Sequence, residues 1–221
     1  MANFSQYYAK QNTVYTEFRT AMRSISRVNT SPYVKEPMAG YLVAFQYNTQ
    51  LMDALTTFLP QISACIPSKL CSHNSIHTTI TVYQQQSFQR FRPDEKILKV
   101  LDTACQEIEP HVLRAVSITF HEWLFNREAV IVAGQPNDAF WEVGERVQRN
   151  GKRHGLDLRM PWGAHITVAR YLRDSEKVNE LASLVKKAPI LEESKPATVW
   201  VGHYLPTKTG IELVPYSTLE C

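Results

Sequence analysis

The same short pattern occurs twice in the chain, and it constrains the fold more than any other feature of the sequence. One copy begins at His77 and reads His-Thr-Thr-Ile-Thr-Val-Tyr, and the other begins at His165 and reads His-Ile-Thr-Val-Ala-Arg-Tyr. Both are rich in β-branched residues, which favour strands. Alternate residues of a strand project from one face, so Thr79 is expected beside His77 and Thr167 beside His165. Two such strands facing each other would bring two imidazoles and two hydroxyls to one cleft.

Residues around the motifs extend this prediction. Continued alternation places Tyr83 and Tyr171 on the motif faces, where they would border a pocket, although packing in the core is an almost equal alternative. The same alternation puts Arg170 on the reverse face. Trp162 lies three residues before the second histidine and is expected to contact the substrate.

The two motifs resemble those of the 2H phosphoesterase superfamily, which includes bacterial RNA 2′,3′-cyclic phosphodiesterases, once called 2′-5′ RNA ligases. That family has two His-x-Thr/Ser motifs, each on a strand and usually followed by an apolar residue, as Ile80 and Val168 follow here. Arg170 matches a basic residue often found five positions after the second histidine in the RNA cyclic phosphodiesterase branch. The resemblance covers about residues 38–221 and implies a two-lobed, duplicated α+β fold with a central cleft.

Hydrophobic periodicity and turn residues predict alternating helices and strands. Helices are expected at about 4–28, 49–65, 93–109, 138–150 and 175–187, and strands outside the motifs at 41–47, 113–124, 128–134, 197–205 and 211–216. Pro60 is expected to interrupt or end its helix. We therefore predict an N-terminal helical extension and connector at residues 1–37 and a single bilobal domain at residues 38–221. The domain reads as two loosely similar halves, each with a motif strand followed by a helix and a strand pair.

The predicted N-terminal helix carries an apolar stripe and a parallel basic stripe. The basic stripe consists of Arg19, Arg23 and Arg27. It is either the solvated face of a helix that packs against the core or a basic lid over an anion-binding cleft.

Composition excludes several classes of protein. The formal net charge is +3, too small for the basic surface of a protein that binds nucleic acid through a charged stripe. Four cysteines without a Cys-x-x-Cys pair favour reduced thiols. The first residues lack the pattern of a secretory signal, and no apolar run approaches the length of a membrane span. We expect a cytoplasmic protein that does not bind membranes; the sequence does not identify a protein partner.

The chemistry of the motifs favours acid/base catalysis without a cofactor. A catalytic zinc site needs three protein ligands, and the motifs supply two histidines, so no metal is expected. An imidazole titrates near pH ~6.5, so one neutral histidine can activate a nucleophile while a protonated one donates to the leaving oxygen. His77 and His165 are the predicted catalytic residues, and the hydroxyls of Thr79 and Thr167 are expected to bind phosphate oxygens. The motifs do not show which histidine is the base.

These features predict a metal-independent phosphodiesterase acting on a nucleotide or oligonucleotide, such as a 2′,3′-cyclic phosphate, a 2′,5′ linkage or a cyclic nucleotide. The loops at 84–93 and 151–163, which mix aromatic and basic residues, are expected to select the substrate. Two alternatives remain open: a nucleotide- or RNA-binding module without turnover, and a reversible RNA ligase.

Overall fold

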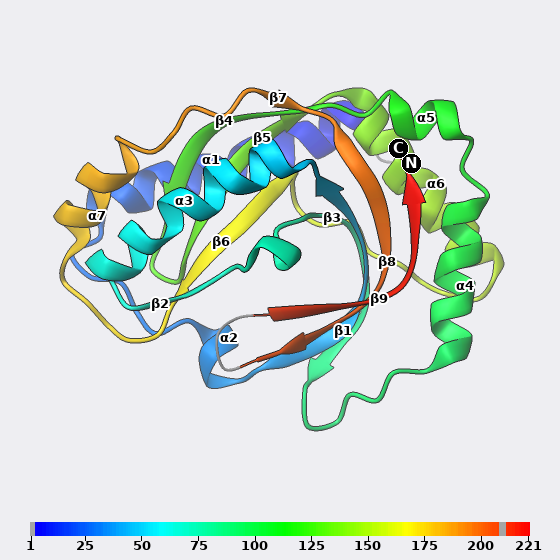
Figure 1. The fold of residues 1–221 in the computed structure, drawn as a ribbon, viewed down its shortest axis with the longest axis horizontal. Coiled ribbons are helices and arrows are strands. Elements are labelled where there is room, and N and C mark those ends of the chain that lie inside the picture. The colour runs from blue at the N-terminus through cyan, green and yellow to red at the C-terminus, as the bar shows by residue number, and fades with distance from the viewer. Residues whose placement is uncertain (1–2, 208–210) are drawn as a thin grey trace.

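Two curved antiparallel sheets form the framework of the protein, and the computed structural model describes residues 3–207 and 211–221. One sheet has the strand order β3-β1-β8-β9 and the other β2-β6-β5-β4-β7 (Figure 1). The strands are β1 (Met38–Tyr47), β2 (Ser68–Leu70), β3 (Thr78–Ser87), β4 (Ile118–Phe125), β5 (Ala129–Pro136), β6 (His165–Tyr171), β7 (Glu193–Ser194), β8 (Pro196–Pro206) and β9 (Ile211–Glu220). The helices are α1 (Phe4–Ser24), α2 (Pro32–Lys35), α3 (Thr49–Cys65), the 3₁₀ turn η1 (His73–Ser75), α4 (Glu95–Gln106), α5 (Pro110–Arg114), α6 (Asp138–Arg153) and α7 (Val178–Val185). The predicted α+β class with a duplicated, two-lobed arrangement is confirmed.

Side-chain caps explain where the longer helices begin. Asn3, Asn48, Asp94 and Asn137 each accept a hydrogen bond from a backbone N–H two or three residues later, which satisfies one of the unpaired donors of a first turn. The expected break at Pro60 is wrong, because α3 continues to Cys65. Apolar side chains of α3 on both sides of the proline are buried, so packing offsets the lost backbone hydrogen bond.

Each lobe is built from both halves of the chain. The prediction that each half forms a lobe from its own motif strand, helix and strand pair is therefore wrong. The strand pair β4 and β5, which follows the first motif, lies in the sheet of the second motif strand β6. The pair β8 and β9, which ends the chain, lies in the sheet of the first motif strand β3. The halves therefore exchange their strand pairs, and this exchange ties the two lobes together.

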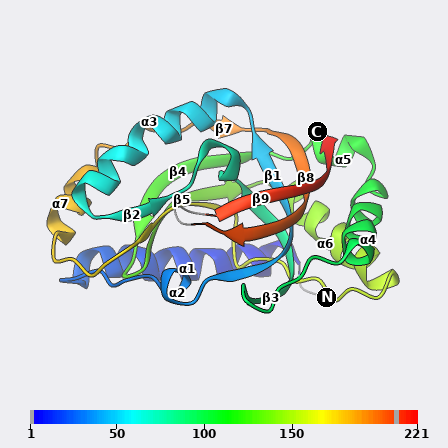
Figure 2. The same cartoon turned by 60° about the horizontal axis from the view of Figure 1, so that its bottom comes forward.

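Helices cover both faces of the five-stranded sheet. Figure 2 shows α1 along one face and α3 with α7 along the other. Tyr15 and Phe18 of α1 pack with Ile131 and Ala133 of β5, whereas the alternate residues of that strand belong to the main core. The predicted helix to residue 28 ends at Ser24, so Arg27 lies beyond α1. Two of the three arginines of the predicted basic stripe form ion pairs, Arg19 with Glu122 and Arg27 with Asp174.

A β-bulge interrupts each motif strand directly after its His-x-Thr sequence. In the pairing of β1 with β3, Val43 lies opposite Thr81 and Ala44 opposite Thr79, so Ile80 is an extra residue. In the pairing of β5 with β6, the same irregularity makes Val168 the extra residue. A bulge places two successive residues on one side of the strand and reverses the alternation that follows.

The bulges overturn part of the predicted alternation. Arg170 is not on the reverse face, because the bulge turns it to the same side as His165 and Thr167. Tyr171 turns instead into the main core. On the first motif strand, Val82 takes the place that simple alternation assigned to Thr81 and Tyr83.

Candidate active site

The two motifs meet in a cavity of about 300 Å³ between the sheets. His77 and Thr79 line one wall, and His165 and Thr167 line another. The remaining walls are mainly apolar and include Tyr33, Val34, Met38, Leu42, Leu70, Val82, Pro161, Trp162, Tyr204, Pro206 and Ile211. The structure thus brings both predicted histidines and both predicted threonines to one concave site.

The two histidines are oriented by the same local hydrogen bond. Nδ1 of His77 lies 2.7 Å from the carbonyl oxygen of Ser75, and Nδ1 of His165 lies 3.0 Å from that of Gly163. A carbonyl oxygen can only accept, so each Nδ1 carries a proton. In the neutral form Nε2 is then the basic nitrogen of both rings, which is the arrangement that acid/base catalysis requires.

Both imidazoles favour the neutral state, because the pKa of each is lowered. The pKa of His165 is lowered to about 4, chiefly by burial and also by the positive charges of Arg170 and His77, against the hydrogen bond to Gly163, which raises it. Burial also lowers the pKa of His77, with Arg170 acting in the same direction and the Ser75 hydrogen bond opposing. A proton on His77 opposes a proton on His165, because like charges repel.

Arg170 supplies a positive charge that no carboxylate pairs with in the described residues. Its guanidinium lies 4.0 Å from the ring centroid of Tyr33, and its buried Nε has no hydrogen-bond partner in that part of the chain. A buried donor without a partner is costly unless a ligand completes it. The cavity therefore suits an anion that accepts hydrogen bonds.

The threonine hydroxyls are also available to a ligand. Across residues 3–207 and 211–221, neither Thr79 nor Thr167 uses its hydroxyl in a hydrogen bond to the protein. By contrast, the hydroxyl of Thr78, on the opposite side of the strand, accepts a hydrogen bond from Tyr47 in the core. The alternation up to the bulge therefore places Thr79 toward the cavity and Thr78 toward the core.

Trp162 lies in the cavity wall and stacks on the second histidine. Its ring centroid is 4.1 Å from that of His165, with the two planes 11° apart. The loop that carries Trp162 is also joined to the first motif strand, since Arg159 and Val82 exchange backbone hydrogen bonds of 2.8 and 3.0 Å. The loop therefore connects the two motifs across the cavity.

Several residues of the predicted site lie elsewhere. Tyr171 is buried in the core, and its hydroxyl lies 3.4 Å from the carbonyl oxygen of Ala129. Tyr83 packs against Tyr41, with 6.2 Å between ring centroids, and is not among the described residues of the cavity wall. Of the two predicted selectivity loops, the described wall includes Gln85, Pro161 and Trp162 and none of the loop arginines or lysines.

Sequence reasoning missed Tyr33, Lys69 and Tyr204, which all line the cavity. Tyr33 falls in a stretch read as a connector, Lys69 lies where no helix or strand was predicted, and Tyr204 lies in a predicted strand with no sign of a ligand-binding role. The spacing of five residues from His165 marked Arg170 in the sequence. The face of the strand on which it lies could not be predicted without knowledge of the bulge.

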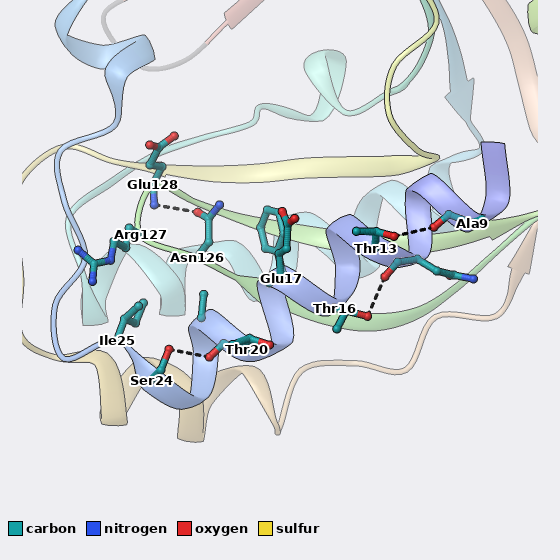
Figure 3. A pocket seen from close by; sticks show the side chains of 13 residues that line it. Ala9, Thr13, Thr16, Glu17, Thr20, Ser24, Ile25, Asn126, Arg127 and Glu128 are labelled. Carbon is teal, nitrogen blue, oxygen red and sulfur yellow. Dashed lines mark hydrogen bonds between the residues drawn. The ribbon is translucent and has the colours of Figure 1, made fainter. Parts of the chain in front are cut away.

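A second and larger hollow, of about 860 Å³, runs along α1 and the β4–β5 turn (Figure 3). The hydroxyls of Thr13, Thr16 and Ser24 there donate to carbonyl oxygens one turn earlier in the same helix. It contains no histidine or cysteine among its described residues. This hollow therefore lacks the imidazole pair that the two motifs bring to the smaller cavity.

The described part of the chain holds no cluster of three or more His, Cys, Asp or Glu side chains suited to a metal ion. Within residues 3–207 and 211–221, no helix is both long and apolar enough to cross a membrane.

The sequence matches no protein-family model and no curated protein sequence. Solved structures of similar fold include E. coli LigT complexed with 3′-AMP, at 11% identity and a TM-score of 0.55 over 83% of this chain and 97% of that one. They also include TT0787 of Thermus thermophilus, at 12% identity and a TM-score of 0.57 over 82% and 97%. A protein described as a phosphoesterase has 14% identity and a TM-score of 0.52 over 82% and 97%. Since LigT is a 2H phosphoesterase, the chain has the fold of the 2H phosphoesterase superfamily, the same group that its two His-x-Thr motifs resemble.

Proposed function

We propose that the protein is a metal-independent 2H-type phosphodiesterase that hydrolyses a phosphodiester of a nucleotide or oligonucleotide. One observation carries the proposal: two histidines, each held with Nδ1–H on a carbonyl two residues earlier, line one cavity together with an arginine that has no paired carboxylate among the described residues. The fold shared with LigT, which has been crystallised with 3′-AMP and with ATP, supports a nucleotide as the ligand.

In the proposed reaction, Nε2 of one neutral histidine takes a proton from the attacking water or ribose hydroxyl. The other histidine, protonated once the phosphate anion is bound, donates its proton to the leaving oxygen. The hydroxyls of Thr79 and Thr167 and the guanidinium of Arg170 stabilise the negative charge on the non-bridging oxygens. A bound anion raises the pKa of both imidazoles, which makes the protonated acid accessible in the complex.

The apolar walls around this polar centre suit a nucleoside. Tyr33, Trp162 and Tyr204 line the cavity beside the charged groups, and aromatic rings stack on nucleobases with little dependence on sequence. The cavity volume of about 300 Å³ is at the lower end of the range for small-molecule sites. The 2′,3′-cyclic phosphate, 2′,5′-linked and cyclic nucleotide classes are all proposed substrates.

A cleavage screen in EDTA tests the proposal. The panel contains 2′,3′-cyclic mononucleotides, 3′,5′-cyclic mononucleotides, and 2′,5′- and 3′,5′-linked oligonucleotides, with His77→Ala and His165→Ala as paired controls. We expect turnover of at least one class in EDTA and a loss of roughly 10²-fold to 10⁴-fold in each variant, the range for a positioned acid or base.

Three outcomes would contradict the proposal in different ways. Turnover that vanishes in EDTA and returns with a divalent ion would refute the metal-independent scheme. Binding without turnover of any class would indicate a nucleotide-binding module. Joining of RNA ends in preference to cleavage would indicate a ligase.

A further inference from the structure

α1 covers the same sheet face from which the second motif projects. Ala133 of β5 lies opposite His165 of β6 in the strand register, and Ile131 lies opposite Thr167. Directly opposed residues of neighbouring strands project from one face. Ile131 and Ala133 are covered by α1, so the helix packs on the sheet directly beside the second motif.

Two buried side chains of α1 hold the backbone immediately before His165. The hydroxyl of Tyr15 donates to the carbonyl oxygen of Ala164 at 2.6 Å and accepts from the N–H of Gly134 at 3.0 Å. The side chain of Gln11 accepts from the N–H of Ala164 at 2.7 Å and donates to the carbonyl oxygen of Gly134 at 3.1 Å. Both side chains are 1% exposed. Both backbone hydrogen-bonding groups of Ala164 are therefore bonded by residues of the N-terminal helix.

Gly163 allows this close approach. A Cβ atom at that position would lie 2.7 Å from Cγ of Gln11, closer than real Cβ contacts. The carbonyl oxygen of Gly163 is also the acceptor for Nδ1 of His165. The residue that orients the imidazole is thus itself packed under the side chain of Gln11.

α1 also supports the ring that stacks on the imidazole. Trp162 lies between His165 and two aromatic residues of α1: the edge of Tyr15, with centroids 5.6 Å apart at 87°, and Phe18, with centroids 6.2 Å apart at 30°. Tyr15 therefore contacts both parts of the support, through its hydroxyl and through its ring.

We propose that α1 is a positioning element for the second motif, in which Gln11 and Tyr15 fix the backbone at Ala164, and Tyr15 and Phe18 hold Trp162 against His165. None of the three side chains is among the described residues of the cavity wall, so they act through other groups. The expected effect of α1 on kcat rests on the proposed function, whereas its effect on the orientation of the His165 ring does not. His77 has no equivalent support from α1 in the interactions of the described chain, so the two histidines differ in what holds them.

Tyr15→Phe tests the proposal, with Tyr7→Phe as its matched control. Both tyrosines are buried in α1, but the hydroxyl of Tyr7 has no hydrogen-bond partner among the described residues. The readouts are the NMR signals of the Nδ1–H protons of both histidines and, with a substrate, kcat and KM. In Tyr15→Phe we expect the His165 signal to broaden through faster exchange with solvent, the His77 signal to stay unchanged, and kcat to fall about tenfold with KM within a factor of about two. In Tyr7→Phe we expect neither signal to change.

Phe18→Leu provides a second test that leaves the Tyr15 and Gln11 hydrogen bonds intact. Loss of the Phe18 ring loosens Trp162, so the ring-current shift of the His165 protons is expected to decrease while the His77 protons keep theirs. His165 signals that stay unchanged in both Tyr15→Phe and Phe18→Leu would overturn the proposal. Signals of both histidines that change equally in Tyr15→Phe and in Tyr7→Phe would also overturn it, because they would indicate a general loosening of the fold. If no substrate is turned over, the NMR result still decides whether α1 positions the ring.

The groups near His165 that could alter these signals by titration come from several elements. They are Arg170 on β6, His77 before β3, Cys71 and Lys69 at β2, Tyr33 on α2, Tyr204 on β8 and Tyr15 on α1. Spectra are therefore compared at one pH, at which the thiol of Cys71 is neutral, because burial raises the pKa of Cys71 to about 11.

Discussion

At the scale of single residues, the electrostatics of the cavity depend on Arg170. Its positive charge lowers the pKa of both His77 and His165, in addition to the larger effect of burial. It is also the charge that a phosphate would neutralise. We therefore expect Arg170 to influence both the affinity for an anion and the pH at which the histidines change state.

This dual role predicts the effect of Arg170→Gln. Removing the guanidinium takes away a charge that opposes protonation, so the pKa of both histidines is expected to rise toward about 6.5. In the wild type the optimum of kcat/KM should lie below that pH, because both free-enzyme values are lowered. In Arg170→Gln the whole profile should move to higher pH and KM should rise about tenfold or more.

Arg170→Lys is the control for this prediction, since it keeps the charge but loses the planar contact with Tyr33. Values of kcat/KM measured from acid to alkaline pH for the three proteins provide the test. An Arg170→Gln profile that coincides with the wild type would show that Arg170 does not influence the titrating pair. The two limbs of the wild-type profile belong to the coupled pair. Of His77→Ala and His165→Ala, the variant that loses the acidic limb identifies the base.

At the scale of elements, the segment between α1 and β1 is held by backbone hydrogen bonds of Val28 with Ser175 and of Ser31 with Tyr171, and by the carboxylate of Asp174. Asp174 accepts hydrogen bonds from the backbone N–H and the hydroxyl of Thr30, at 2.7 and 3.1 Å, and pairs with Arg27. The Thr30 backbone bond first, and then Arg27, lower the pKa of Asp174 to about 2. The pairing therefore persists at every pH at which the proposed reaction would be measured.

The anchor predicts a change in substrate binding for Asp174→Asn. α2 follows the anchored segment and carries Tyr33 to the cavity, so a looser segment should weaken binding. We expect KM to rise about threefold with kcat nearly unchanged, an effect suited to an exposed ion pair. Glu142→Gln, which removes an exposed pair with Arg146 within α6, is the control and should change neither constant. A fall in kcat without a change in KM would contradict this role.

At the scale of the whole molecule, one core joins the two sheets. Phe140 of α6 is fully buried and contacts Tyr7 of α1 and Phe45 of β1, with centroids 6.1 and 6.0 Å apart. Tyr7 lies on a helix that packs on the five-stranded sheet, whereas Phe45 lies on a strand of the four-stranded sheet. We still propose residues 38–221 as the bilobal domain, onto which α1 packs.

Phe140→Ala is therefore expected to lower the free energy of unfolding by about 3–5 kcal/mol, because it leaves a cavity where three elements meet. Denaturant titration followed by circular dichroism measures the change. Phe88→Ala is the control, since Phe88 is 42% exposed and its loss should change stability by less than about 0.5 kcal/mol. Similar losses in the two variants would show that Phe140 does not join the sheets.

The sequence by itself determined the features that depend on neighbouring residues. Alternation over three residues was enough to place His77 with Thr79 and His165 with Thr167, because the period of a strand is local. The caps at Asn48, Asp94 and Asn137 bond to backbone only two or three residues away, so the beginnings of those helices could be predicted.

Only the tertiary structure decided the features that depend on a partner strand. A bulge exists as two residues opposite one, so the extra residues Ile80 and Val168 cannot be recognised without β1 and β5 beside them. For that reason alternation misplaced Arg170 and Tyr171. The pairing of β1 with β8 and the contacts of α1 with Ala164 join segments that lie far apart along the chain. Such contacts are set by how apolar faces pack in space, and no local pattern in the sequence records them.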